Sequence, residues 1–249
     1  MEDGTRTAAI EVVLALAENM PAPIRKAPET KTVFIPALAR MLMEVTADDA
    51  EWLEEAEDTD NLASNPVSTA ASSIQRLSQC LGEKTTLVCC QPIIAECVRS
   101  DTNSQKQAGY HMLGLIAETC KESYAKNLAE AMQTASAGVN NSDQRVRYAA
   151  LGALSQLMEQ LSPYVQIKYH SELMPILCGL MVSESNLKMQ TQATRSVLAF
   201  CKGLQTFADD DEELTKVSGA EIMQIYSAKT LEALVSLLEK SISQNHEGL

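Results

Sequence analysis

Residues Ala149–Leu161 read AALGALSQLMEQL, and the related stretch AGYHMLGLIAETC occupies Ala108–Cys120, 41 residues earlier. A third copy, QATRSVLAFCKGL, occupies Gln192–Leu204, and weaker copies lie at Ala8–Asn19 and Ser72–Glu83. Each copy opens with small residues and continues with apolar residues three or four positions apart, the spacing of one face of an α-helix. A helical unit that returns about every 40 residues predicts a stack of helix pairs.

A second apolar helix is expected after each copy, because a further stretch with helical apolar spacing follows every time. These second stretches lie at Val33–Val45, Thr85–Val98, Lys126–Val139, Gln166–Val182 and Tyr226–Lys240. Three of them contain a proline, Pro36, Pro92 or Pro175, which removes a backbone donor and bends a helix. The polar run Asn140–Asp143 predicts an N-cap for a helix that begins at Gln144.

The pairs predict an all-α solenoid of about five repeats, with about ten principal helices in an extended array. We expect one solenoid over residues 1–249, with repeats at about 5–47, 66–99, 104–139, 142–183 and 187–243, an acidic insertion at 48–65 and an acidic linker at 207–213. The apolar spacing predicts buried side chains at Leu113, Ile116, Leu154, Leu157 and Leu198.

Charge limits the partners of this chain. Its 249 residues carry 33 acidic and 20 basic side chains, a formal net charge of −13. Because phosphate binding needs a positive surface, the charge argues against nucleic acid or anionic membrane as a direct partner and favours basic proteins or peptides. No apolar run is long enough to span a bilayer. The seven cysteines lie in apolar helical patterns, which is typical of reduced, buried thiols in a cytoplasmic or nuclear protein.

The stretch DDAEWLEEAEDTD at Asp48–Asp60 holds eight carboxylates, no basic residue and the chain's only tryptophan, Trp52. The carboxylates are those of Asp48, Asp49, Glu51, Glu54, Glu55, Glu57, Asp58 and Asp60. One interpretation is a solvated charge run without a partner. The other, favoured because the stretch interrupts a packed array, is a docking segment for a basic surface that stays mobile until its partner binds. Trp52 could add cation–π contact to that partner if exposed, or could fold back as a local anchor.

Acidic side chains also mark the second helices of the pairs. They are Glu44, Glu96, Glu130, Glu172 and Glu232. These glutamates could serve solubility alone, or they could form a concave acidic face that binds the lysine and arginine side chains of a basic peptide.

No residue pattern supports catalysis or a cofactor, because the chain lacks a Walker loop, a GxGxxG stretch and an HExxH motif. Cys89, Cys90 and Cys97 lack the CxxC spacing of a metal site and have no histidine nearby in sequence, so we interpret them as core thiols. His111 and His170 lie beside no nucleophile and are expected to have packing or surface roles.

The stretch DQRVRYAALGALSQL at Asp143–Leu157 resembles a HEAT repeat of the importin beta superfamily of nuclear transport receptors. The order of features also resembles the central repeats of its importin five branch over about residues 5–205: an acidic stretch with a tryptophan, then IQRLSQCLG, QPIIAECV, AGYHMLGLIAE and RVRYAALGAL. The resemblance implies binding of basic cargo or import signals, shuttling between cytoplasm and nucleus, and release by Ran-GTP. By the same resemblance, Asp48–Asp60 corresponds to the acidic loop that importin beta proteins use near Ran and basic cargo, and nucleoporins are further partners.

The chain departs from the family pattern in two respects. HEAT repeats often carry an Asp and an Arg that form a ladder between repeats, whereas Arg6, Lys106, Arg147 and Gln190 occupy the Arg position here and Asn141 the Asp position before Arg147. The chain also opens without a capping repeat, so we expect a fragment of a longer receptor whose main Ran contact lies elsewhere. The alternative interpretation is a static HEAT scaffold, similar to a phosphatase or chromosome-complex subunit.

Overall fold

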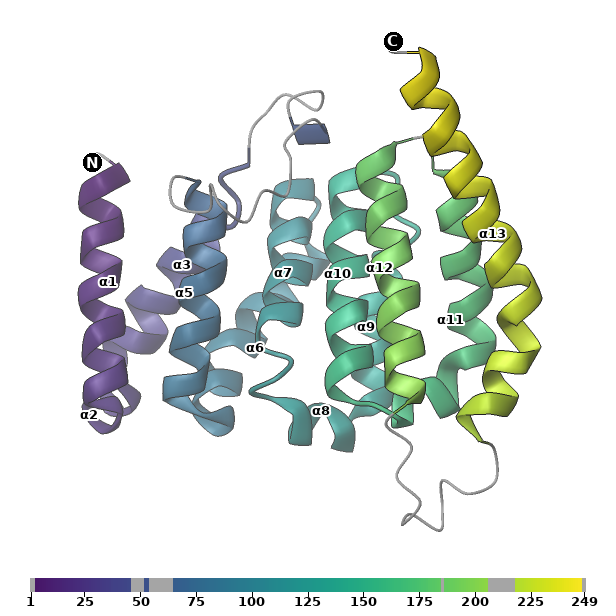
Figure 1. Ribbon diagram of the computed structural model, residues 1–249. Coiled ribbons are helices and arrows are strands. Elements are labelled where there is room, and N and C mark those ends of the chain that lie inside the picture. Colours follow the sequence, from purple (N-terminus) through teal and green to yellow (C-terminus); the bar gives the residue numbers. More distant parts are fainter. Residues whose placement is uncertain (1–2, 46–51, 54–64, 185, 206–217, 248–249) are drawn as a thin grey trace. The chain divides into compact units, whose positions relative to one another are not determined.

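The computed structural model of the chain describes residues 3–45, 52–53, 65–184, 186–205 and 218–247. These residues form helices joined by turns, and none of them lies in a strand (Figure 1). The helices are α1 Asp3–Asn19, α2 Pro21–Lys26, the π-helical turn η1 Thr30–Phe34, α3 Ile35–Met41, α5 Pro66–Leu81, α6 Glu83–Arg99, α7 Asn103–Leu115, α8 Lys121–Lys126, α9 Leu128–Ala137, α10 Gln144–Gln160, α11 Tyr164–Ser183, α12 Leu187–Leu204 and α13 Gly219–Glu247. Within the described ranges, no helix combines the length and the apolar character that crossing a bilayer requires.

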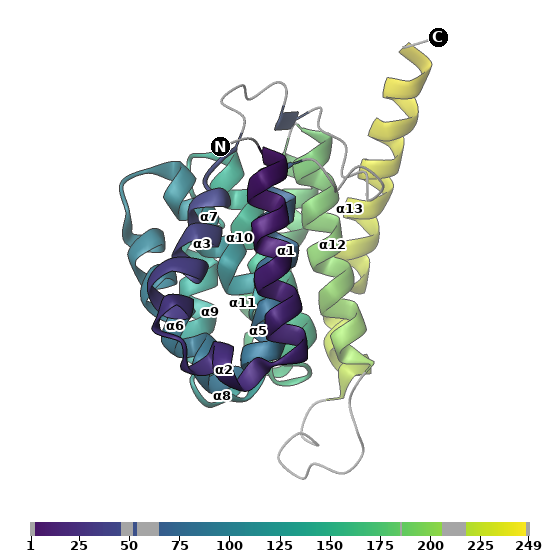
Figure 2. The ribbon, with the colours of Figure 1, turned by 90° about the vertical axis from the view of Figure 1, so that its left-hand side faces the viewer.

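The helices group into two compact units, residues 1–153 and 154–249, with the boundary inside α10. In the first unit α1 packs on α5, which packs in turn on α6 and α7. The helix α3 packs on α5, α6 and α7, and Figure 2 shows α3 and α6 on one side of α1 and α5. In the second unit α11 packs on both α12 and α13. The predicted repeat boundaries stay a prediction.

Side-chain caps fix where several helices begin. Asn65 accepts a 2.8 Å hydrogen bond from the backbone N–H of Val67 at the start of α5, and Asn186 caps α12 in the same way. Asp143 Oδ1 accepts from Arg145 N at 2.9 Å, which confirms the N-cap predicted before Gln144. Each cap satisfies backbone donors that have no partner inside the first turn of the helix.

The three prolines of the second helices occupy two kinds of position. Pro92 and Pro175 lie inside α6 and α11, where the sequence placed them. Pro36 instead lies in the first turn of α3, directly after the π-helical turn, so the helix predicted from Val33 starts later. A proline is tolerated in a first turn because the N–H it lacks would have no partner in the helix.

Four of the five predicted core residues are buried: Leu113, Ile116, Leu154 and Leu157. The prediction for Leu198 is wrong, because its side chain is 51% exposed. The buried stripe of α12 contains Val197 and Phe200, which lie three residues apart. Because a helix turns by about 100° per residue, Leu198 lies about 100° from Val197 around the helix axis. Leu198 therefore points away from the face that packs on α11.

Polar side chains in the interior follow the repeat. In the first unit the hydroxyls of Ser78 and Thr119 lie 3.0 Å apart, and in the second unit the hydroxyl of Ser155 donates to that of Ser196 at 2.9 Å. Both pairs join residues 41 positions apart, the interval that separates two of the sequence copies. Hydrogen bonding between repeats offsets the cost of burying these hydroxyls.

Candidate functional site

Of the predicted acidic segment, the structure describes only Trp52 and Leu53. The eight carboxylates, which lie outside the described residues, are those of Asp48, Asp49, Glu51, Glu54, Glu55, Glu57, Asp58 and Asp60. Trp52 itself is 5% exposed, so the local-anchor interpretation of this side chain is confirmed and the exposed one is wrong. The predicted mobility and docking role of the segment concern residues outside the described ranges.

Trp52 packs against two side chains of α10, more than ninety positions later in the chain. Its ring centroid lies 5.5 Å from that of Tyr148, with the two rings at 88° in an edge-to-face arrangement. The guanidinium carbon of Arg145 lies 5.4 Å from the centroid of the indole, within the range of a cation–π contact. Arg145 and Tyr148 are three residues apart and therefore share one face of the helix.

The start of α10, where Trp52 binds, is held by several polar contacts. Asp143 caps the helix through Oδ1, while its Oδ2 accepts a 2.9 Å hydrogen bond from Asn103 Nδ2. Arg147 Nη1 donates to the backbone oxygens of Asn141 at 3.0 Å and Ser142 at 3.1 Å. Both sides of the turn before α10 are thus fixed, and with them the surface on which Trp52 packs.

The five glutamates predicted to share a face are all exposed. Four of them lie on the second helices: Glu96 on α6, Glu130 on α9, Glu172 on α11 and Glu232 on α13. Glu44 does not, because α3 ends at Met41, and it pairs instead with Arg6 of α1 at 2.7 Å. The four belong to different units, so a common acidic face stays a prediction.

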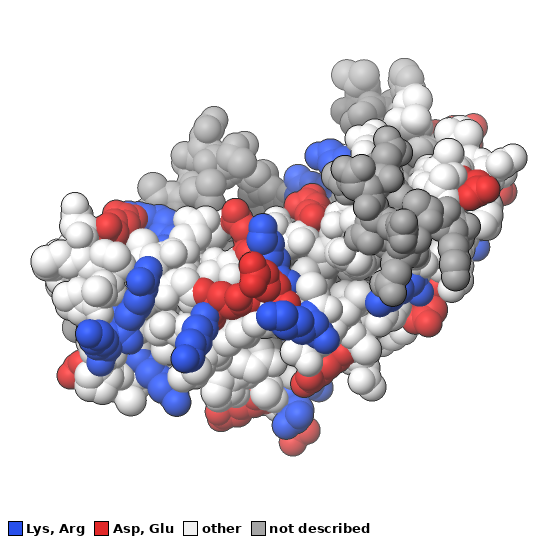
Figure 3. Space-filling view, turned by 90° about the horizontal axis from the view of Figure 1, so that it is seen from below, with Lys and Arg blue, Asp and Glu red and all other residues white. Residues whose placement is uncertain are grey.

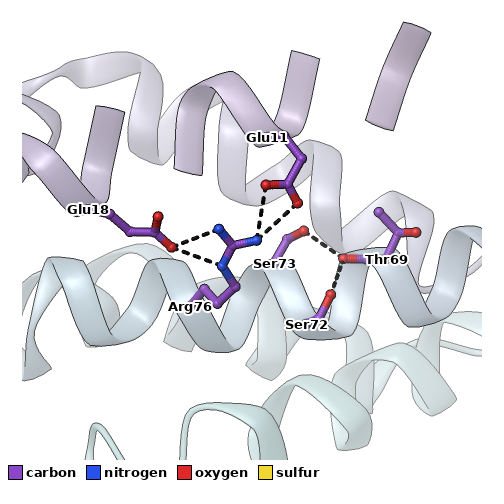
Figure 4. A network of polar contacts seen from close by, with 6 residues as sticks. All are labelled: Glu11, Glu18, Thr69, Ser72, Ser73 and Arg76. Carbon is purple, nitrogen blue, oxygen red and sulfur yellow. Dashed lines mark hydrogen bonds and ion pairs between the residues drawn. The ribbon is translucent and has the colours of Figure 1, made fainter. Parts of the chain in front are cut away.

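An ion-pair network between α1 and α5 was not predicted from the sequence (Figure 4). Arg76 lies between two carboxylates, with Nη1 2.9 Å from Glu11 and Nη2 2.8 Å from Glu18. Its hydrogen bonds to Glu18 and Glu11 raise the pKa of Arg76 above its ordinary value. The available signal was the seven-residue spacing of Glu11 and Glu18, which places both on one face of α1.

The seven cysteines are free thiols. Burial raises the pKa of Cys89, Cys90 and Cys97, and it raises that of Cys120 to about 12. Among the described residues, no group of three His, Cys, Asp or Glu side chains could hold a metal ion. Thiols with raised pKa values carry little thiolate at neutral pH, which suits a packing role.

The two histidines considered from the sequence both take part in packing. Burial lowers the pKa of His111, on α7, to about 4. In the second unit, His170 Nδ1 lies 2.9 Å from the hydroxyl of Tyr226, and this hydrogen bond joins α11 to α13.

Charge on the described surface is mixed. Figure 3 shows lysine and arginine side chains interspersed with aspartate and glutamate on the face seen from below. The net charge of −13 thus does not produce a uniformly acidic surface on that face. The densest run of acidic residues is the segment around Trp52 in the sequence, which makes that segment the leading candidate for binding a basic partner.

Two family models match the chain. One, described as "Importin repeat", matches residues 1–88, and another, described as "IPO5-like, TPR repeats", matches residues 89–210. The chain is 24% identical to importin subunit beta-3 of Saccharomyces cerevisiae over 203 residues, 80% of this chain and 18% of that protein. It is 31% identical to probable importin subunit beta-4 of Schizosaccharomyces pombe over 143 residues, 57% of this chain and 12% of that protein.

The structure also matches solved structures of Kap121p. With Kap121p bound to Pho4p the TM-score is 0.82 at 22% identity, over 96% of this chain and 22% of that chain. With Kap121p bound to RanGTP the TM-score is 0.81 at 22% identity, and the match covers 95% of this chain and 22% of that chain. The predicted all-α HEAT solenoid fold is thereby confirmed. The chain spans less than a fifth of these two curated relatives and about a fifth of the solved chains.

Proposed function

Because this chain belongs to the importin beta superfamily, in the branch of importin five and Kap121p, we propose that it supplies HEAT repeats with which a nuclear transport receptor binds basic cargo. The observation that carries the proposal is the acidic segment Asp48–Asp60, which is attached to the repeats through the buried Trp52. Eight carboxylates with no basic residue among them create a strongly negative region that attracts lysine-rich and arginine-rich segments.

The exposed glutamates of the second helices extend this proposal. Glu96 and Glu130 in the first unit, and Glu172 and Glu232 in the second, present carboxylates to solvent. A basic import signal is extended and flexible, so within either unit it can contact the carboxylates of neighbouring repeats. In this proposal the acidic segment speeds the encounter, and the glutamates of the helices add contacts to the bound peptide.

The partners of the relatives suggest the other steps of the transport cycle, beyond cargo binding. Kap121p has been solved bound to Pho4p, to RanGTP and to Nup53p. We propose that the receptor containing this chain likewise binds cargo, Ran-GTP and nucleoporins, and that it shuttles between cytoplasm and nucleus. Ran-GTP would release the cargo by favouring a conformation with lower affinity for it.

The proposed action is binding without covalent chemistry. Importin beta relatives are transport receptors, and this chain would act as they do, through equilibrium affinity rather than through an enzymatic step. A static scaffold with the same fold would bind its partners regardless of Ran. The response of cargo binding to Ran-GTP therefore separates the two functions.

The test compares the wild-type chain with a variant in which all eight acidic residues of Asp48–Asp60 become Asn or Gln. Binding of a lysine-rich import-signal peptide is measured by surface plasmon resonance from low to high salt, and again after Ran locked with GTP is added to the whole receptor. We expect a slower association rate and a weaker salt dependence in the variant, because the Debye length falls from about 8 Å to about 3 Å between physiological and 1 M salt.

A control variant neutralises the second acidic run, Asp209–Glu213, and should bind almost as the wild type does. If the first variant matches the wild type in affinity, rate and salt dependence, the segment is a solvated spacer. If Ran-GTP leaves cargo bound to the whole receptor, the transport function is wrong and the scaffold interpretation replaces it.

A further inference from the structure

The helix α13 has apolar side chains on two of its sides. Ile222, Thr230 and Ala233 are buried on the side that packs on α11, where Thr230 Oγ1 lies 3.6 Å from Cys178 Sγ. On the roughly opposite side lie four large apolar side chains that the described residues leave between 53% and 61% exposed: Leu231, Val235, Leu238 and Ile242. A soluble protein normally buries such a second apolar stripe against another element.

The exposed stripe has the spacing of a helix–helix interface. From the exposed Ala228 its members follow at intervals of three, four, three and four residues, which are alternate a and d positions of a heptad. Side chains at these positions form one line along a helix and insert between the side chains of a neighbouring helix. These five residues, called the α13 seam below, therefore fit a helix that lies alongside α13 rather than an extended peptide.

Charge beside the α13 seam adds a requirement for that helix. Glu232 and Glu239 each follow a leucine of the seam, at e positions, and both are exposed. In a second copy of this chain, the residues opposite them would be Ser227 and Leu234 in a parallel pair, or the same glutamates in an antiparallel pair. Neither arrangement supplies a positive charge, so the seam is complementary to a different helix, one with lysine or arginine opposite the two glutamates.

The stacking of helices indicates the source of such a helix. In a solenoid each repeat is covered by its neighbours, and a repeat without a neighbour carries a polar outer face. The outer face of α13 is apolar along the seam, so it is unlike a capping surface. The match to the solved Kap121p chain covers only 22% of that chain, and a receptor of that length has residues enough to supply a covering helix.

We propose that the α13 seam is the interface on which the longer receptor packs a further α-helix, which places lysine or arginine opposite Glu232 and Glu239. The partner is thus a segment of the same receptor outside residues 1–249. The proposal rests on the proposed function in one respect only, that this chain belongs to a longer receptor. It requires neither the acidic segment nor cargo.

A covered seam and an uncovered seam respond differently to the same substitutions. In the isolated chain, Leu231→Ser with Leu238→Ser changes two exposed side chains, and surface substitutions of this kind have little effect on folding. In the whole receptor the same double variant removes two leucines from a packed interface. A difference between chain and receptor therefore reports whether the seam is covered.

Hydrogen exchange measures that difference, because backbone amides exchange through local opening of the helix. We expect the amides of residues 231–242 to exchange at least about tenfold more slowly in the whole receptor than in the isolated chain, since covering leucines stabilises the closed helix. The double leucine variant should lose most of this protection in the receptor and exchange as the wild type does in the isolated chain.

Two further variants separate apolar packing from charge. Glu232→Gln with Glu239→Gln should lower the protection in the receptor by a smaller factor, and high salt should remove the difference from the wild type. Ile176→Ser is the matched control, because α11 already packs on both α12 and α13 and Ile176 is 38% exposed on it. The ratio of exchange rates between chain and receptor should stay at its wild-type value in this control.

Other occupants of the seam give different results, and each would overturn the inference. If residues 231–242 exchange equally fast in chain and receptor, no part of the receptor covers the seam. If they do so and the isolated chain sediments as a dimer that the double leucine variant abolishes, a second copy occupies it. If protection in the receptor requires an added lysine-rich amphipathic peptide, a separate protein occupies it. None of these measurements uses cargo, so a failure of cargo binding, which contradicts the proposed function, leaves this result unaffected.

Discussion

Arg147 and Gln190 make the same contact in different repeats, although one side chain is a guanidinium and the other an amide. Arg147 Nη1 donates to the carbonyl of Asn141, and Gln190 Nε2 donates to the carbonyl of Glu184 at 2.7 Å. In both cases the acceptor lies six residues earlier, in the turn before the helix. The sequence suggested an incomplete ladder at Gln190, but the amide performs this part of the arginine's role.

Gln190→Leu should therefore lower the free energy of unfolding by about 1 kcal/mol, because it removes a hydrogen bond from a buried side chain and leaves the Glu184 carbonyl without this donor. Urea unfolding of the purified variant measures the change. Gln205→Leu, at an exposed position, is the control and should stay within about 0.5 kcal/mol of the wild type. If the two variants unfold at the same urea concentration, Gln190 does not perform the role of Arg147.

Leu154 and Leu198 form a matched pair for the core. Leu154→Ala should cost about 2–5 kcal/mol, because it empties a site that is 1% exposed, whereas Leu198→Ala should cost less than about 0.5 kcal/mol. Thermal and urea unfolding followed by circular dichroism give both values. Similar losses for the two leucines would show that α12 is rotated relative to the arrangement described.

Gly138 and Gly179 differ in the space that surrounds them. A Cβ on Gly138 would lie 2.6 Å from both Ala150 Cβ and the Tyr110 ring, so Gly138→Ala should cost about 1–3 kcal/mol. Nothing lies within 4 Å of a Cβ on Gly179, inside α11, and Gly179→Ala should stabilise the chain by up to about 1 kcal/mol. Opposite shifts in melting temperature are the expected result, and shifts of the same sign would count against it.

His111 should make stability depend on pH. Its folded-state pKa of about 4 lies below the ordinary value of 6.5, so above pH 6.5 it is neutral in both states and has no effect. As pH falls from 6.5 towards 4 the unfolded state takes up the proton first, and stability falls by at most about 1.4 kcal/mol per pH unit. Below about pH 4 the loss is complete. His111→Gln should remove this slope, and identical pH profiles for variant and wild type would refute the low pKa.

Cys80 and Cys201 should be the first thiols to react. These two thiols are partly exposed, whereas the other five are buried. Their partial burial still raises the pKa of Cys80 and of Cys201, so both should react slowly. Titration with a thiol reagent at neutral pH should therefore label at most two sites before unfolding, and at a low rate. The double variant Cys80→Ser and Cys201→Ser should lose that phase. Rapid labelling of a third thiol in the folded chain would conflict with the observed burial.

Local chemistry decided which features the sequence could reveal. The helix copies and the Asp143 cap were predictable because apolar spacing and capping act within a few residues. Leu198 was misjudged because a spacing of three or four allows two adjacent stripes on a helix, and only packing selects one. Glu44 was misplaced because α3 ends at Met41, three residues before Glu44, although the apolar pattern continues to Val45.

The candidate site was less predictable, since its contacts join distant parts of the chain. The sequence named Trp52 and left two roles open, and only the fold brings Arg145 and Tyr148 to the indole. Arg76 and its two carboxylates are separated by 58 and 65 positions, so the network depends on how α1 packs against α5. Interactions of this kind require the tertiary arrangement.

The contact between Trp52 and α10 also affects where the chain can accept inserted residues. The connection from α3 to α5 runs from Leu42 to Asn65, and the Trp52 contact divides it into two shorter closed loops. The entropy of closing a loop grows only with the logarithm of its length, so doubling either loop costs about 0.6 kcal/mol. Residues can therefore be inserted on either side of Trp52 with little effect on the packed helices. This connection is the natural place to graft a recognition sequence into the chain.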